Sequence, residues 1–187
     1  GAEKHWLPAM PFVALLGGLG VSWLWTRCVQ QLALPAVVAR SGGVLLAVLV
    51  LLPPALEVRR SHPYGLTHYN LLAGGPTGGA TLGMNRQFWG YAVRGLFPYL
   101  NRQSRPGLSV YFHDANLYQL QMSQKDGLLR RDVYDSGMEE PGVRASDLAL
   151  VIHEKHFNKY EYWIWDAFGT TQPSYVVTHE GVPVVTL

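Results

Sequence analysis

The stretch HPYGLTHYNLLAGGPTGG, residues 62–79, carries side chains that could bind a phosphate or a sugar. Imidazole, amide and guanidinium groups can all donate hydrogen bonds to phosphate oxygens and to sugar hydroxyls. Such donors gather in this stretch and just after it, at His62, His68, Asn70, Arg86 and Gln87. The order of aromatic, amide and glycine residues suits neither a helix nor a strand. The stretch is therefore a candidate substrate-binding loop.

Two interpretations of this loop remain open. As a connector, it would use His62-Pro63 to break a preceding helix and the rings of Tyr64 and Tyr69 to lie at the headgroup level of a membrane. As a shaped lid, it would fold back at the glycine pair 74–75. Asn70 would then supply an amide to hold the turn or a sugar hydroxyl.

Histidines and carboxylates also gather where two predicted strands end. HEKH covers residues 153–156, and FHD places His113 and Asp114 after the neighbouring strand. The carboxyl ends of parallel strands are where α/β sheets collect ligands, and such a group could bind a divalent metal. The spacing does not match the HExxH motif, and a strand exit rich in polar residues explains it more simply. We therefore predict no catalytic residue and no metal ligand here.

Two long apolar runs must position these residues. Residues 6–26 carry no Asp, Glu, Lys, Arg or His, and about 20 helical residues can cross a hydrocarbon core roughly 30 Å thick. A second charge-free run, residues 41–56, is short, but its backward extension to residue 32 adds only Arg40, which could snorkel to the interface. We predict two transmembrane helices, at about 6–26 and 32–56, within residues 1–60.

The charges around the two runs predict their orientation. The connection carries Arg27 and Arg40 and no acidic residue, so the positive-inside rule favours a cytoplasmic turn with both ends of the hairpin outside. Trp23 and the prolines near the start fit a membrane span better than a cleaved signal sequence. Because the chain does not begin with Met, we expect it to be a fragment of a longer protein.

The composition changes after Arg60, from apolar runs to a charged and aromatic pattern of globular type. We predict a juxtamembrane lid or connector over residues 61–84 and an extracytoplasmic α/β domain over residues 85–187. Cys28 is the only cysteine and lies in the helical part, so the outer part can form no disulfide.

The outer part alternates helical and strand patterns. We expect helices at 88–100, 115–127 and 157–169, strands at 108–114 and 147–154, and a closing hairpin over 173–187 that turns at Glu180-Gly181. Strands that alternate with helices predict right-handed crossovers. The fold class is therefore a membrane helical hairpin followed by a small α/β three-layer domain with a mostly parallel sheet and an antiparallel edge.

The stretch HPYGLTHYNLLAGGPTGGATLGMNRQFWG, with EKHWLPAMPFVALL before the hairpin, resembles the C-terminal part of bacterial membrane glycosyltransferases of the GT-C superfamily. The similar group is the protein-mannosyltransferase or aminoarabinose-transferase-like family, and the resemblance covers about residues 3–95. Its motif order is His-Pro-aromatic, Tyr-Asn, Gly-Gly, Gly-Met and Trp-Gly, found here at His62, Pro63, Tyr64, Tyr69, Asn70, Gly74, Gly75, Gly83, Met84, Trp89 and Gly90.

This resemblance implies an integral-membrane enzyme that transfers a sugar from a polyprenyl-phosphate donor to an extracytoplasmic acceptor, with inversion. The family takes its catalytic base from an acidic residue in an early outer loop, with a divalent metal in some branches. No segment here corresponds to that loop, so we expect this fragment to be inactive alone. The resemblance places substrate-binding groups at Lys4, His5, His62, Tyr64, Tyr69 and Asn70, although Lys4 and His5 could simply flank a span.

The expected partners are the membrane, the lipid-linked sugar donor and the remainder of a polytopic transferase, with no nucleic acid. The expected location is the bacterial inner membrane, with the C-terminal domain on the periplasmic side. The alternative function is a non-enzymatic membrane-anchored α/β domain that binds a partner or glycan. Further apolar spans in the full reading frame would favour the enzyme.

Overall fold

The structure is a computed structural model that describes residues 7–113 and 117–187. The chain divides into two compact units, residues 1–57 and residues 58–187. The helices are η2 (Leu7–Ala9), α1 (Met10–Gln31), α2 (Ala36–Ser61), η3 (Gly65–Thr67), η4 (Leu71–Ala73), α3 (Gly75–Thr81), η5 (Tyr91–Leu96), α4 (Phe97–Arg102), α5 (Leu117–Lys125), α6 (Glu139–Arg144), η6 (Lys155–Phe157) and α7 (Asn158–Phe168). The strands are β1 (Ser109–Tyr111), β2 (Tyr134–Asp135), β3 (Leu148–Ala149), β4 (Val151–Ile152), β5 (Val176–His179) and β6 (Val182–Thr186).

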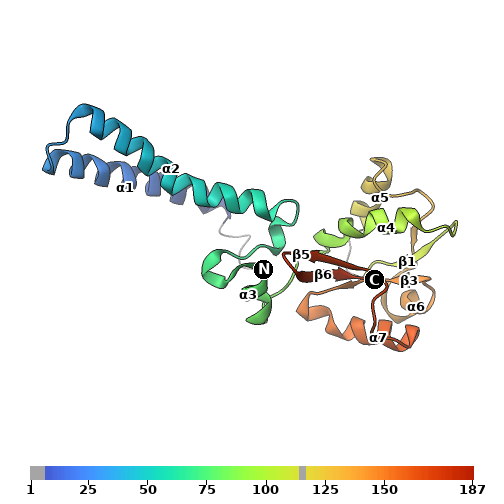
Figure 1. The fold of residues 1–187 in the computed structure, drawn as a ribbon. Helices are drawn as coiled ribbons and strands as arrows, with labels where there is room; N and C mark the ends of the chain where they lie inside the picture. The colour runs from blue at the N-terminus through green and yellow to red at the C-terminus, as the bar shows by residue number, and fades with distance from the viewer. Residues whose placement is uncertain (1–6, 114–116) are drawn as a thin grey trace. The chain divides into compact units, whose positions relative to one another are not determined.

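The first unit is a pair of long helices that lie side by side (Figure 1). The indole Nε1 of Trp25 in α1 donates a hydrogen bond to the carbonyl of Ala39 in α2, over 3.2 Å. Gly42 lets the helices approach there, because a β-carbon at this position would lie 2.5 Å from the Trp25 ring. Small residues at helix contacts are typical of membrane helix packing.

Both helices are long and apolar enough to cross a membrane, with mean hydropathy 1.4 for Met10–Gln31 and 2.1 for Ala36–Ser61. The expected pair of apolar helices is therefore present, with shifted ends. The first helix runs to Gln31 and the second to Ser61, beyond the predicted residues 26 and 56. A helix continues past its apolar run because its backbone hydrogen bonds do not require apolar side chains. The second helix also continues through Pro53 and Pro54.

The second unit is built on two three-stranded sheets that share one extended segment. Strand β1 pairs in parallel with β2 and β3, in the order β2-β1-β3. Strand β4 pairs antiparallel with β6, which also pairs with β5. Between β3 and β4, the amide of Leu150 donates to the carbonyl of Tyr111 over 2.9 Å. The predicted strand 147–154 therefore belongs to both sheets.

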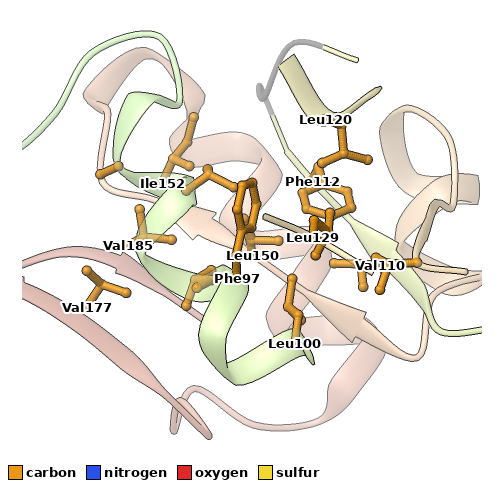
Figure 2. Packing of buried hydrophobic residues seen from close by; sticks show 14 of the residues in the cluster. Phe97, Leu100, Val110, Phe112, Leu120, Leu129, Leu150, Ile152, Val177 and Val185 are labelled. Atoms are coloured by element: carbon orange, nitrogen blue, oxygen red, sulfur yellow. The ribbon is translucent and has the colours of Figure 1, made fainter. Parts of the chain in front are cut away.

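Helices cover both faces of this strand system because side chains alternate along it. Val110, Phe112, Leu150 and Ile152 join the large buried cluster, which includes residues of η5, α4 and α5 (Figure 2). The intervening side chains join a second cluster with Val143 of α6 and Ile164 of α7: Tyr111, Ala149 and Val151. The small α/β region with a parallel sheet is thus confirmed. Its antiparallel sheet has as many strands as the parallel one, which is more than the predicted edge.

The structure differs most from the predicted elements at residues 88–100 and at residues 130–146. Residues 88–100 were expected to form one amphipathic helix, but the chain forms the 3-10 helix η5 and then the short helix α4. Gly90 at φ 62° begins η5, and Pro98 occupies the first turn of α4, where its missing N–H costs no hydrogen bond. Strand β2 and helix α6 were not expected, because residues 130–146 are mostly polar.

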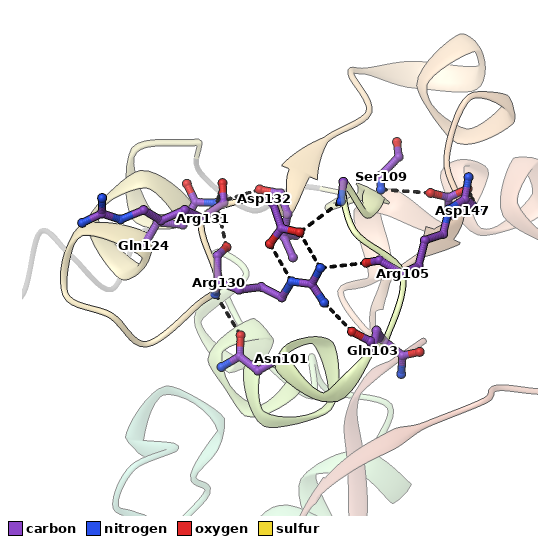
Figure 3. Close-up of polar contacts among 11 residues, drawn as sticks. Asn101, Gln103, Arg105, Ser109, Gln124, Arg130, Arg131, Asp132 and Asp147 are labelled. Carbon is purple, nitrogen blue, oxygen red and sulfur yellow. Dashed lines mark hydrogen bonds and ion pairs between the residues drawn. The ribbon is translucent and has the colours of Figure 1, made fainter.

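A polar latch at Arg130 holds two loops together near the start of β1 (Figure 3). The guanidinium pairs with Asp132 at 2.5 Å and donates to the carbonyls of Gln103 and Arg105. The Asp132 carboxylate also accepts from the amide of Gly107. Asp132 therefore has a pKa well below its ordinary value, chiefly because of its hydrogen bond with Arg130.

Candidate functional site

Asn70 lies where the juxtamembrane segment turns. Its side-chain Oδ1 accepts a hydrogen bond from the amide of Ala73 over 3.1 Å and so caps the 3-10 helix η4. Gly74 follows at φ 78°, a left-handed conformation that suits glycine. The segment therefore folds back at the predicted glycines, and the Asn70 carbonyl oxygen holds the turn. The residue remains exposed.

Tyr69 is held within the second unit by its ring and its hydroxyl. The hydroxyl donates to the carbonyl of Asn85 over 2.6 Å. The ring lies against helix α3 at Gly79, where a β-carbon would be 2.4 Å from the ring. Tyr69 thus fastens the first half of the segment to the loop that carries Arg86 and Gln87.

Tyr64 packs against the main hydrophobic cluster, half-buried. Its ring centroid lies 5.5 Å from that of His179, and the His68 ring lies 6.5 Å from the same imidazole. Burial raises the pKa of the Tyr64 hydroxyl, with a further contribution from Tyr175. Burial also lowers the pKa of the His179 imidazole. These three rings form an aromatic group at the end of strand β5.

His62 lies apart from this group and is exposed. It lines an open hollow with Arg59 and Tyr91, and the Tyr91 hydroxyl donates to the carbonyl of Pro63 over 2.5 Å. The structure therefore separates the predicted substrate-binding residues into distinct places. Lys4 and His5 lie outside the described residues.

The loop at residues 85–89 is clamped to the exit of strand β4. The amide of Arg86 donates to the carbonyl of His153, and the amide of Trp89 donates to Oε2 of Glu154 over 3.1 Å. The amide of Lys155 in turn donates to Oδ1 of Asn85. Glu154 is only 3% exposed, so its carboxylate holds the loop rather than facing solvent. Part of the HEKH stretch is thus structural.

The same junction carries perturbed titratable groups. The pKa of His153 falls to about 4, first because the imidazole is buried and second because Arg86 is close. Burial raises the pKa of Glu161, an effect that Arg86 opposes. His153 is therefore neutral near pH 7. One nitrogen of its imidazole can then donate a hydrogen bond, and the other nitrogen can accept one. Gln87, which follows Arg86 in the sequence, is fully buried, and its side-chain amide atoms have no hydrogen-bond partner among the described residues.

Histidines and carboxylates at the strand ends do not form a metal-binding group among the described residues. Within residues 7–113 and 117–187, no group of three or more His, Cys, Asp or Glu side chains could hold a metal ion. Asp114 lies outside the described residues, and the side chain of His156 is not described. The described side chains therefore provide no basis for a metal centre.

A cavity of about 360 Å³ opens beyond the end of β1, and the sequence pattern indicated only part of it. Its lining includes His113, which was expected at a strand exit. Met138 and Glu139 also line it, in the stretch expected only to cross the surface. Their signal would have been the aspartate-serine-glycine turn at residues 135–137, which ends strand β2 at the same edge of the sheet.

Comparison with known proteins does not assign this site. No protein-family model, no curated protein and no solved structure matches the chain.

Proposed function

We propose that this chain is the C-terminal portion of an integral-membrane glycosyltransferase that transfers a sugar from a polyprenyl-phosphate donor to an extracytoplasmic acceptor. The observation that supports the proposal is the order of the helices, the connecting segment and the α/β unit along the chain. Two helices of membrane-spanning length lead into an α/β unit through the segment whose motifs resemble the GT-C enzymes. In this proposal the outer unit is periplasmic and the enzyme resides in the bacterial inner membrane.

The juxtamembrane segment would shape the substrate site as a folded lid. Tyr69 and Asn70 support this role, because their contacts fix the turn and join it to the loop at residues 85–89. The exposed imidazole of His62 and the exposed amide of Asn70 would face a phosphate or sugar hydroxyl. Tyr64 would position the lid through its packing on the core. Lys4 and His5 would complete the phosphate site.

The catalytic base would come from an earlier part of the enzyme. A general base must lie within hydrogen-bond reach of the attacking group, and the resemblance gives no residue of this chain that role. A divalent metal, if the enzyme uses one, would bind there too. The isolated chain would therefore transfer no sugar.

A second candidate function is a membrane-anchored binding domain. The cavity at the end of β1 favours it, because open α/β sheets bind ligands beyond the carboxyl ends of their strands. The full reading frame separates the two candidates. Many further apolar spans, with an acidic pair in the first outer loop, would support the transferase.

The decisive experiment measures glycosyl transfer from a polyprenyl-phosphate sugar by the full-length protein, per correctly inserted molecule. Asn70→Asp keeps an oxygen that can cap η4 but removes the amide donor, whereas Asn70→Ala removes both. If the amide binds substrate, both variants should lose at least about tenfold in rate, or about 1.4 kcal/mol of transition-state stabilisation. His62→Ala should lose activity similarly.

The matched control is Leu72→Ala, in the same turn and 98% exposed, which should retain wild-type activity. If Asn70→Asp is as active as wild type while Asn70→Ala is not, Asn70 only caps the turn. If all three variants at positions 62 and 70 are fully active, the segment is a connector. Absence of transfer by the full-length protein with every lipid-linked sugar tested would contradict the enzymatic proposal itself.

A further inference from the structure

The cavity beyond strand β1 lies where three strands end. Tyr111 is the last residue of β1, the middle strand of the parallel sheet. Met138 and Glu139 follow β2, and the remaining wall comes from the chain after β4. The lining residues are Tyr111, His113, Met138, Glu139, Phe157 and Tyr160. Its volume of about 360 Å³ falls within the range of small-molecule sites, roughly 300–1,000 Å³.

Aromatic rings form most of the wall, and they are steeply inclined to one another. The His113 ring centroid lies 5.4 Å from those of Phe157 and Tyr160, with interplanar angles of 75° and 90°. Phe157 and Tyr160 are 5.7 Å apart at 52°, and Tyr111 meets His113 at 75°. A nucleobase stacks on a ring parallel to it. In three of these pairs the edge of one ring meets the face of another, so the wall offers a ligand inclined rings rather than a parallel stack, and inclined rings also form the aromatic cages that hold ammonium groups.

The charge of the cavity agrees with a cationic ligand. Glu139 contributes a carboxylate, and none of the lining residues that the structure describes is Lys or Arg. The ammonium of Lys159, which is outside the lining, lies 4.8 Å from the centroid of the Tyr160 ring, so a ligand cation would have to displace it or meet the opposite face of this ring. Negative ring faces and a carboxylate disfavour phosphate and carboxylate ligands.

The backbone holds two of the wall residues in unusual conformations. His113 has φ 52° and Glu139 has φ 56°, both in the left-handed region that disfavours residues with a β-carbon. Glycine would adopt these conformations without strain, yet both positions carry side chains that line the cavity. Residues held in such conformations cluster at ligand sites.

We propose that this cavity binds a small organic cation of the quaternary or methylated ammonium class, held by the faces of Tyr111, Phe157 and Tyr160 and balanced by Glu139. The site would take a free cation of this kind or the ammonium headgroup of a lipid. The proposal does not depend on glycosyl transfer, since it needs only the folded outer unit.

The test is calorimetric titration of the full chain, in detergent at pH 8, with choline and with its neutral isostere 3,3-dimethylbutanol. Choline should bind saturably and at least about tenfold more tightly than the isostere, because only choline gains the cation–π attraction. Equal binding of choline and the isostere would overturn the proposal. So would the absence of saturable choline binding up to about 50 mM, because a weaker affinity would not indicate a specific site.

Two variants locate the binding. Glu139→Gln changes an exposed side chain and removes only its charge, so folding should be unaffected while choline affinity falls roughly 3- to 10-fold. Tyr160→Leu should weaken choline binding roughly 2- to 30-fold. The matched control is Tyr162→Leu on the same helix, 65% exposed and outside the lining, which should bind as wild type. Unchanged affinity in both Glu139→Gln and Tyr160→Leu would overturn the assignment.

The source of the cation is distinguished in nanodiscs. Weaker apparent choline affinity in phosphatidylcholine discs than in phosphatidylglycerol discs would support a lipid headgroup as the ligand. Equal affinity in the two discs would support a soluble cation. Loss of choline binding from both kinds of disc, for protein that remains folded, would overturn the site.

Discussion

Leucines in the two units of this protein have opposite surroundings. Leu16 in α1 and Leu49 in α2 are 67% and 61% exposed, whereas Leu96 and Leu150 in the α/β unit are fully buried. Neither membrane-length window contains a buried residue. The helical pair therefore has no core of its own among its described residues, and its apolar side chains are exposed, as they are on helices that lie in lipid. The α/β unit has a buried hydrophobic core of its own.

This contrast shows why each unit has its own architecture. A helix satisfies its backbone hydrogen bonds internally, so it can lie in lipid without a partner strand. The strands of the α/β unit leave edges that water or other elements must satisfy. If the helical pair lies in lipid, Leu and Val side chains stabilise the two units in different solvents, and matched substitutions can test this difference.

The largest effect is expected from removal of a core leucine. Leu150→Ala should lower the free energy of unfolding of the α/β unit by about 2–5 kcal/mol, because it leaves a cavity in the large hydrophobic cluster. Leu49→Ala in α2 should change it by no more than about 0.5 kcal/mol. Denaturant unfolding of both variants in the same micelles, followed by near-UV circular dichroism, measures the difference. Equal losses would mean that the two leucines share one kind of environment.

An introduced charge should affect the helical pair more than the α/β unit, which is the reverse of the leucine truncations. Leu49→Arg should disfavour insertion by about 2.5–3.5 kcal/mol, because the guanidinium would lie within the hydrocarbon. Leu128→Arg, at a residue 42% exposed in the α/β unit, should leave insertion unchanged. Sidedness is measured with Cys28→Ser as background, using cysteines introduced at Gln30 and at Lys125. Without a further substitution, these two cysteines in the Cys28→Ser background should be labelled from opposite sides of the membrane. Labelling of both from one side would contradict the helical hairpin.

Two glycines provide a smaller contrast. A β-carbon at Gly79 would lie 2.4 Å from the Tyr69 ring, so Gly79→Ala should destabilise the α/β unit by about 1–3 kcal/mol. Gly17 in α1 has nothing within 4 Å of the same position, so Gly17→Ala should be neutral or should stabilise the helix. Thermal unfolding tests both. Tyr69→Ala combined with Gly79→Ala should cost less than the sum of the two single changes, and full additivity would exclude the ring contact.

The smallest expected effect concerns the latch at Arg130 (Figure 3). The folded pKa of Asp132 lies below its unfolded value of about 3.9, so its stabilising contribution is present above pH 4 and is lost as the pH falls below it. Asp132→Asn should therefore lose less stability than wild type between pH 5 and pH 3. Denaturant midpoints at the two pH values provide the measurement. Identical pH dependence of the two proteins would show that the pair contributes nothing.

The sequence predicted most of the elements that have clear local signals, such as an apolar run or a glycine at a helix end. The apolar runs indicated α1 and α2, Gly127 and Gly169 marked the ends of α5 and α7, and Glu180-Gly181 marked the turn between β5 and β6. The predicted helix at residues 88–100 was wrong in form, because Gly90 and Pro98 divide the stretch into η5 and α4. Strand β2 was missed because two residues give no periodicity.

Less of the candidate site could be predicted. The sequence indicated which residues carry donors, and the structure assigned several of them to structural contacts. Asn70 caps a turn, Tyr69 reaches Asn85, and Glu154 holds the amide of Trp89. The last contact joins residues 65 positions apart, and no periodic pattern encodes it. The roles of His62, Tyr64, Tyr69 and Asn70 toward a substrate remain predictions, as do those of Lys4 and His5.

The sequence by itself distinguished the two membrane-length apolar runs from the globular part of this protein. A long uncharged run favours lipid wherever it lies in a chain, because the transfer free energy of apolar side chains adds along the run. Only the tertiary structure decided that Tyr111, Glu139 and Tyr160 line one cavity, and that the segment at residues 148–152 joins two sheets. These arrangements arise from strand pairing and helix packing between distant residues, and the free energy of such contacts depends on all the partners at once.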